Sequence, residues 1–345
     1  GMGFRVPMII ASPWTRGGWV NSQLFDHTST LMFLEDFIQK KYDKTVKEEN
    51  ISDWRRAIAG NLTSIFRPHG TNEPKLDYLD RDKFVIGIQE ARYKEIPSNY
   101  QNLGAAQIDD INRNLQQSPF TSHQEPGVRP ACPLPYELYA EGSVSTDGTS
   151  FDLRMTAGNK AHGTNSSGAP FNVYLRNLRP DAGGGQRAAT YAVKAGDTLL
   201  QRFPLALFAD SGYSIEVHAP NGFYRSFTGD ATARHIAVGT EYEQSGPELT
   251  GNLSVHLRNT GAEPITVLIV ENSYRAGTVS KDIKPEHESS VALDLKRNHG
   301  WYDFTVRVAG SKAQARFAGH VDTRRSSFSD PLMGGEPRAE LSLKG

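Results

Sequence analysis

The stretch "SGYSIEVHAPNGFYRSFTGD" (211–230) decides the fold of most of this chain, because a related stretch, "HGWYDFTVRVAGSKAQARFAGH" (299–320), follows it. Apolar and polar residues alternate in both, which gives a β-strand one buried and one exposed face. Three apolar pairs align at an offset of 89 residues: Tyr213 with Tyr302, Ile215 with Phe304 and Val217 with Val306.

Two further matches lie upstream of this pair. "APFNVYLRN" (169–177) matches "EPITVLIVE" (263–271) at an offset of 94, and "FDLRMTAGN" (151–159) resembles "LSVHLRNTG" (253–261) at an offset of 102. One order of strands repeated at this long period indicates two related domains and not a solenoid. From Tyr136 onward, short alternating segments separated by turn residues predict two β-sandwiches in tandem.

Paired aromatic residues recur at equivalent places in the two repeats, in "NGFYRSF" (221–227) and "HGWYDF" (299–304). They could form a cage for a sugar or a choline group, since cations favour aromatic faces. Their equivalent placement favours packing in the core instead.

The N-terminal region has a different pattern. "VPMIIA" (6–11) is an apolar run typical of a strand covered on both faces. "SPWTRGG" (12–18) then turns the chain where open α/β sheets bind ligands. Because no other parallel strand is evident in this sequence, we expect this strand to expose its apolar side chains: Val6, Met8, Ile9 and Ile10. We also expect residues 1–66 to dock poorly without a partner, and residues 136–330 to fold on their own.

Two helices are expected next. "FDHTSTLMFLEDFIQKKY" (25–42) carries an apolar stripe of Leu31, Leu34 and Ile38, preceded by capping residues. "SDWRRAIAGNLTSIF" (52–66) predicts a second helix that starts at Ser52 and buries four side chains: Trp54, Ile58, Leu62 and Ile65.

Composition narrows the class of protein. The chain has 345 residues, 37% apolar content and a net charge of −1, which gives no electrostatic reason to expect binding to nucleic acid. No apolar run is long enough to span a membrane, and the first residues do not read as a secretion signal. Cys132 is the only cysteine, so an internal disulfide and a cysteine-rich metal site are excluded. The ten histidines are scattered and form no zinc-helix motif, so the residues alone define no complete active site.

Three segments carry a family resemblance: "RVPMIIASPWTRGGWVNSQLFDHTSTLMFLE" (5–35), "ISDWRRAIAGNLTSIF" (51–66) and "QEPGVRPACPLPYEL" (124–138). They resemble the end of the catalytic domain, the following helix and the linker of bacterial non-haemolytic, phosphocholine-preferring phospholipases C. The two β repeats resemble the paired C-terminal domains of that branch.

The resemblance implies a fold class: an α/β segment from the end of an alkaline-phosphatase-like catalytic domain, followed by two all-β, immunoglobulin-like sandwiches. The expected boundaries are 1–134 for the α/β part with its linker, 135–238 and 239–335 for the two repeats, and 336–345 for a tail.

The resemblance also implies a phosphoric diester hydrolase that is secreted or periplasmic and cleaves phosphatidylcholine to diacylglycerol and phosphocholine. The family's nucleophile and metal-ligand motifs are absent from this sequence. We therefore expect no metal site here, a divalent metal at most in an upstream part of the catalytic domain, and little activity of the chain alone. The alternative is a non-catalytic β-sandwich module for binding or stabilisation.

Four residues are candidates to lie near the active site of such an enzyme: Trp14, Arg16, Asp26 and His27. Arg16 could pair with a phosphate, and Asp26 with His27 could lie beside a metal or a phosphate. Each also has a structural interpretation: Trp14 packed, Arg16 in a surface loop, Asp26 as a helix N-cap and His27 in the first helical turn.

Overall fold

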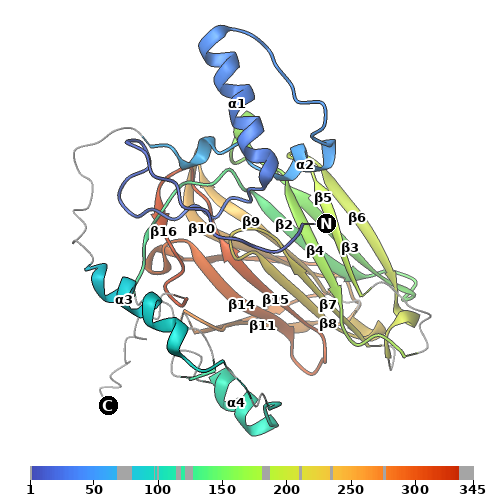
Figure 1. Cartoon of the computed structure of the whole chain (residues 1–345). Helices are drawn as coiled ribbons and strands as arrows, with labels where there is room; N and C mark the ends of the chain where they lie inside the picture. Colours follow the sequence, from blue (N-terminus) through green and yellow to red (C-terminus); the bar gives the residue numbers. More distant parts are fainter. Residues whose placement is uncertain are drawn as a thin grey trace, which may run out of the picture.

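We describe a computed structural model of the chain, shown in Figure 1. It describes residues 2–67, 80–96, 98, 101–113, 118–120, 127–180, 187–209, 212–233, 236–274 and 277–333. The expected tail at 336–345 lies outside these residues. The α-helices are α1 (His27–Tyr42), α2 (Asp53–Ile58), α3 (Asp82–Glu90) and α4 (Ala105–Arg113).

Most of the described chain is β-sheet. The first repeat contributes β2 (Leu138–Val144), β3 (Ser150–Ala157), β4 (Ala169–Leu175), β5 (Ala188–Val193), β6 (Thr198–Pro204), β7 (Tyr213–His218) and β8 (Tyr224–Gly229). The second contributes β9 (Ile236–Ser245), β10 (Glu248–Asn259), β11 (Ile265–Glu271), β12 (Thr278–Ile283), β13 (Glu288–Leu293), β14 (Trp301–Val308) and β15 (Gln314–His320). Two short strands, β1 (Pro130–Ala131) and β16 (Ser327–Phe328), lie outside the repeats.

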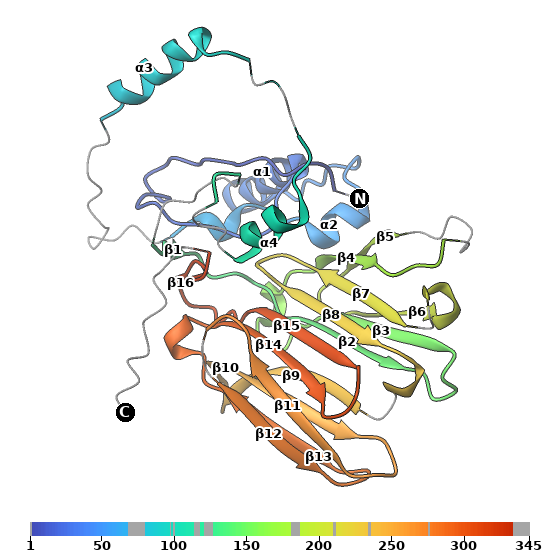
Figure 2. The ribbon, with the colours of Figure 1, turned by 90° about the horizontal axis from the view of Figure 1, so that it is seen from below.

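The two repeats are joined edge to edge. Eight of the described strands form one sheet in the order β12-β11-β14-β15-β8-β7-β4-β5. The antiparallel pairing of β15 with β8 is the seam between the repeats, with Phe317 opposite Arg225 and Ala315 opposite Phe227 (Figure 2). Outward from the seam, the second repeat continues with β14, β11 and β12, and the first repeat continues with the equivalent strands β7, β4 and β5. The two repeats are therefore related by a pseudo-twofold axis at the seam.

Two smaller sheets complete the sandwiches, with orders β2-β3-β6 and β13-β10-β9. β2 and β9 meet at the seam, where the Tyr139 and Tyr242 rings lie 5.7 Å apart. The buried side chains of both repeats form one hydrophobic cluster that crosses the seam through Phe227 and Phe317. The tandem domains therefore share a single core.

The register refines the repeat found in the sequence. Val173 pairs with Val217 in the first repeat, whereas Ile269 pairs with Val306 in the second. Since Val217 and Val306 are counterparts, Val173 corresponds to Ile269. The sequence match at an offset of 94 pairs Val173 with Val267, two residues earlier. A shift of two leaves the same face buried, because the side-chain period of a strand is two.

The aromatic residues of the two repeats pack in the core, as their equivalent placement indicated. Phe223, Phe227, Tyr302 and Phe304 are each at most 5% exposed, and Trp301 is 9% exposed. An exposed cage built from these rings is therefore excluded.

The strand predicted at 6–11 does not form among the described residues of this chain. These residues form no strand, and Val6, Met8 and Ile9 are exposed, while Ile10 is half-buried. The described part of the chain provides no neighbouring strand to pair with residues 6–11. Without that hydrogen bonding, a strand is not stabilised here. The expected exposure is confirmed for three of the four side chains.

The second predicted helix is too long. α2 begins after its Ser52 cap as expected but ends at Ile58, and a short 3-10 turn covers Thr63–Ile65. The helix ends where the backbone of its C-cap, Ala59, becomes extended. The following Gly60 packs so closely against Gln23 and Phe25 that a Cβ would lie 2.6 Å from the Gln23 amide. Ile58, Leu62 and Ile65 are buried as predicted, and Trp54 is only half-buried.

Residues 19–66 dock on the first repeat, contrary to the expected poor docking. The Leu24 N–H donates to the buried Tyr136 hydroxyl at 3.0 Å, and Gln23 Nε2 donates to Ser167 Oγ at 3.1 Å. Val20 forms a parallel bridge with Ala131, which itself pairs with β16. The N-terminal region is thus tied to both ends of the β region.

Candidate functional site

Asp26 is the N-cap of α1. Its carboxylate accepts the Thr28 N–H at 2.8 Å, and the Ser29 hydroxyl accepts the Asp26 N–H at 3.0 Å, which forms a reciprocal capping box. The same carboxylate forms an ion pair with Arg55 on α2. Burial alone would raise the Asp26 pKa, but the bonds from Thr28 and Arg55 outweigh it and hold that pKa below its usual value. These contacts give the carboxylate a structural role.

The other three candidates lie at the surface of the described part of the chain. Trp14 is 55% exposed, and Arg16 and His27 are exposed. Arg67 connects the loop to the 3-10 turn: its N–H donates to the Trp14 carbonyl at 3.1 Å and its guanidinium donates to the Arg16 carbonyl. A direct catalytic role for these residues remains a prediction.

Sequence reasoning missed a polar cluster at the C-terminal end of β15. His320 Nδ1 lies 3.0 Å from Asp322 Oδ1, and His320 Nε2 lies 3.2 Å from Ser327 Oγ, an arrangement that resembles a serine–histidine–aspartate triad. Both His320 and Asp322 are buried. The sequence signal was "GHVD" (319–322), where a histidine and an aspartate two apart share one face of an extended segment.

Hydrogen bonding shows that this cluster is not poised for nucleophilic catalysis. His320 Nε2 lies 2.9 Å from the His299 carbonyl, which can only accept, so this nitrogen carries a hydrogen. It therefore has no lone pair to take a proton from Ser327, whose own hydroxyl donates to the same carbonyl at 2.9 Å. The cluster instead holds β16 against the second repeat, helped by a 2.9 Å bond from Trp301 Nε1 to the Phe328 carbonyl.

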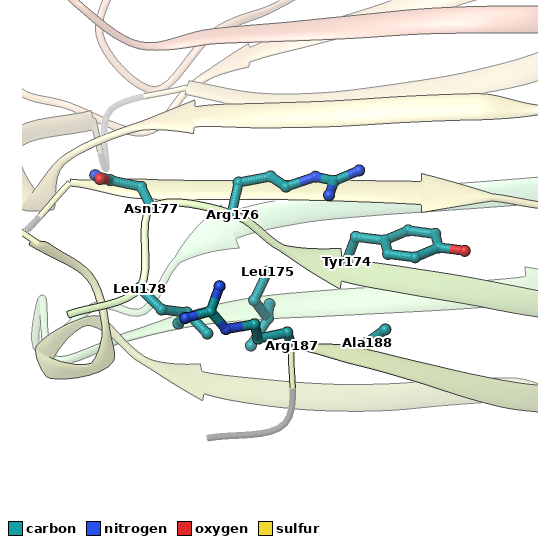
Figure 3. Close-up of a pocket in the computed structure, with 7 residues that line it drawn as sticks. All are labelled: Tyr174, Leu175, Arg176, Asn177, Leu178, Arg187 and Ala188. Carbon is teal, nitrogen blue, oxygen red and sulfur yellow. The ribbon is translucent and has the colours of Figure 1, made fainter. Parts of the chain in front are cut away.

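A shallow groove of about 440 Å³ lies where β4 ends and β5 begins (Figure 3). Arg176 and Arg187 both line it, so its chemistry favours an anion. The Arg176 guanidinium already donates two bonds to Glu216, at 2.7 and 2.9 Å, and stacks 5.0 Å from the Tyr174 ring centre. No carboxylate, histidine, cysteine or serine is among the described residues that line it, so these residues offer no general base.

The described residues do not fit a metal centre. Across them, no three His, Cys, Asp or Glu residues gather closely enough to hold a metal ion. Asp26, the carboxylate proposed beside a metal, is bonded to Thr28 and Arg55 instead. Among the same described residues, no helix is long and apolar enough to cross a membrane.

Comparison with known proteins agrees with this architecture. The family model "Bacterial phospholipase C, C-terminal domain" matches residues 130–230 and again 236–320, one match on each β repeat. The model "Phosphoesterase family" matches residues 1–39. The two β repeats thus match the C-terminal domain of bacterial phospholipases C, and the N-terminal segment matches the phosphoesterase family.

Similar curated proteins are bacterial phospholipases C. The chain is 36% identical over 344 residues to the non-hemolytic phospholipase C of Pseudomonas aeruginosa, covering 97% of this chain and 44% of that protein. It is 32% identical to the hemolytic phospholipase C of the same organism, covering 96% of this chain and 45% of that protein. It is also 34% identical to the non-hemolytic phospholipase C of Burkholderia pseudomallei, covering 96% of this chain and 43% of that protein.

The chain belongs to the bacterial phospholipase C family. It spans less than half the length of these relatives.

Proposed function

We propose that this chain acts as the C-terminal part of a phospholipase C, in which residues 1–66 close the catalytic domain and the β repeats form its tail. The reaction would be hydrolysis of phosphatidylcholine to diacylglycerol and phosphocholine by an exported enzyme, with catalytic groups supplied from the preceding part of the domain. The family match at residues 1–39 supports the junction.

One observation carries the proposal: α1 turns two of the three residues of its apolar stripe, Leu31 and Leu34, away from the rest of the described chain, while Ile38 is half-buried. Leu31 and Leu34 are 43% and 47% exposed, and Phe37 beside them is 43% exposed. Ser29 and Met32, on the opposite side of the helix, are its buried residues. A stripe built for a core but left uncovered marks a surface that another part of the protein covers.

The exposed side chains of residues 6–9 extend the same argument. Val6 and Ile9 are 79% and 95% exposed in a run whose composition suits a strand buried on both faces. We infer that these residues become the last strand of an alkaline-phosphatase-like sheet when the preceding strands are present. The ladder would then satisfy their backbone groups and cover the side chains.

We further infer that each β repeat has an immunoglobulin-like topology. The first, second and fifth strands of each repeat form one sheet, and the third, fourth, sixth and seventh form the other. This division of seven antiparallel strands between two packed sheets supports that assignment.

The test is reconstitution from two pieces. This chain would be mixed with the preceding portion of the P. aeruginosa non-hemolytic phospholipase C, and both association and hydrolysis of a chromogenic phosphocholine ester would be measured. We expect activity only from the mixture, and an at least tenfold weaker association for Leu31→Asp/Leu34→Asp. Leu200→Asp, at a 51% exposed position on β6, is the matched control and should change neither the association nor the activity of the mixture. Hydrolysis by this chain alone, or unchanged association of the double variant, would contradict the proposal.

A further inference from the structure

The segment 80–96, which contains α3, is not covered by any other described residue. Every residue from 80 to 96 is exposed, and Figure 2 shows α3 standing apart from the sheets. Its large apolar side chains are nevertheless numerous. Their exposed fractions are 62% for Phe84, 44% for Val85, 51% for Ile86, 74% for Ile88, 75% for Tyr93 and 87% for Ile96.

The apolar residues are arranged on one face of the helix. At 100° per residue, Phe84, Val85 and Ile88 fall within one arc of α3, together with Ala91 just after its end. Ile86 lies on the other side, beside Lys83 and Glu90. α3 is therefore amphipathic, and its apolar face meets no part of the described chain.

The charges of the segment identify what covers this face. Residues 80–96 contain four basic and four acidic residues, so the segment has no net charge. Arg92 and Lys94 flank Tyr93, and the Arg92 guanidinium lies 4.7 Å from the Tyr93 ring centre. Aromatic rings beside long cationic side chains suit the boundary between lipid headgroups and acyl chains, where such side chains extend toward water.

We propose that residues 80–96 bind the surface of an electroneutral phospholipid bilayer, with Phe84 and Ile88 inserted and α3 lying in the plane of the interface. The choice of lipid as the occupant rests on the proposed function, because an enzyme that cleaves phospholipids must reach them in a bilayer. α3 is far too short to span a membrane, which leaves an interfacial position. The absence of net charge makes apolar insertion the driving force, and not attraction to anionic lipid.

The experiment is co-sedimentation of the whole chain with phosphatidylcholine vesicles, with no hydrolysis measured. We expect binding that changes less than about threefold when salt is raised or anionic lipid is added, because the segment is neutral. Phe84→Ser/Ile88→Ser should weaken binding at least tenfold, since the burial of two large apolar side chains in the bilayer is lost. Ile86→Ser, at an apolar residue that is also exposed but lies on the other face, should bind within twofold of the wild type.

Several outcomes would overturn the proposal: no vesicle binding by the wild type, equal loss in Ile86→Ser and the double variant, or binding abolished by salt. If the double variant loses affinity for the preceding catalytic portion but not for vesicles, the face is a protein contact and the proposal also fails. Circular dichroism checks that the β-sheet signal is unchanged in each variant. Since binding is measured on this chain alone, failed reconstitution of activity would count against the proposed function and leave this result standing.

Discussion

Arg225 Nη2 donates a 3.0 Å hydrogen bond to the Tyr302 hydroxyl and so links the first repeat to the second inside their shared core. Arg225 is 0% exposed, and its Nη1 donates to the Ala318 carbonyl at 2.8 Å and to the Tyr224 carbonyl at 2.9 Å. Its guanidinium also lies 4.1 Å from the Phe223 ring centre. The counterpart of Arg225 in the second repeat is Ala315, so this residue breaks the pseudo-symmetry at the seam.

Arg225→Ala should lower the free energy of unfolding by about 3 kcal/mol or more, because it opens a cavity and leaves the Tyr302 hydroxyl without this donor. Arg225→Met keeps most of the volume and removes a buried charge, so we expect a loss about half as large. Urea denaturation of the two variants measures the difference. Equal losses would mean that hydrogen bonding, and not packing, dominates at this position.

The core of the β repeats was predictable because strand alternation is a local property. Tyr213, Ile215 and Val217 are buried as their spacing indicated, and so are Tyr302, Phe304 and Val306. The seam was not predictable, because pairing β8 with β15 depends on edges that no local pattern describes. A buried arginine there also contradicts the rule that charged side chains lie outside.

The N-terminal region shows where local patterns lead to error. The apolar run at 6–11 reads as a strand, but a strand exists only with a neighbour. The amphipathic helix α1 was predicted correctly, and only the structure shows that Leu31 and Leu34 face away from the rest of the described residues. The His320 cluster escaped prediction because Asp322 and Ser327 acquire meaning only when the chain after β15 folds back on His299.

Asp26→Ala should cost about 1–2 kcal/mol of stability, because it removes both the cap of α1 and the ion pair with Arg55. His27→Ala, at the next and exposed position, should change stability by less than about 0.5 kcal/mol. Thermal unfolding of both variants checks this. A neutral effect of Asp26→Ala would show that the carboxylate is not structural and would renew the case for a role in the active site.

Glu35 makes the stability of the α1–α2 pair depend on pH. Arg56 donates to both Glu35 oxygens at 2.8 Å, and the Glu48 N–H adds a further bond. These contacts lower the Glu35 pKa from 4.5 to about 2. The folded state therefore gains stability above the ordinary pKa, and loses it as the pH falls from about 4.5 towards 2.

Glu35→Gln should therefore cost about 1–2 kcal/mol at pH 7 and progressively less below pH 4.5. Denaturation of wild type and variant across this range measures the difference. The control is Glu95→Gln, at an exposed position, which should show no such convergence. A cost that stays constant down to pH 2 would mean that the variant acts through packing and not through the charge of Glu35.

His320→Ala should free β16 from the second repeat. The substitution removes the contacts to Asp322, to the His299 carbonyl and to Ser327. The Asp322 side chain, which is 5% exposed, keeps the long hydrogen bonds from Asn221 Nδ2, at 3.3 and 3.5 Å. We expect a loss of about 2–4 kcal/mol and faster proteolytic cleavage around residues 321–330. Ser327→Ala, which removes only the peripheral hydroxyl, should cost at most about 1 kcal/mol.

Because β16 pairs with β1 and β1 with Val20, cleavage near residue 20 should also accelerate in His320→Ala. If it does not, the N-terminal region is held by Gln23 and Leu24 alone, and the cluster stabilises only the second repeat.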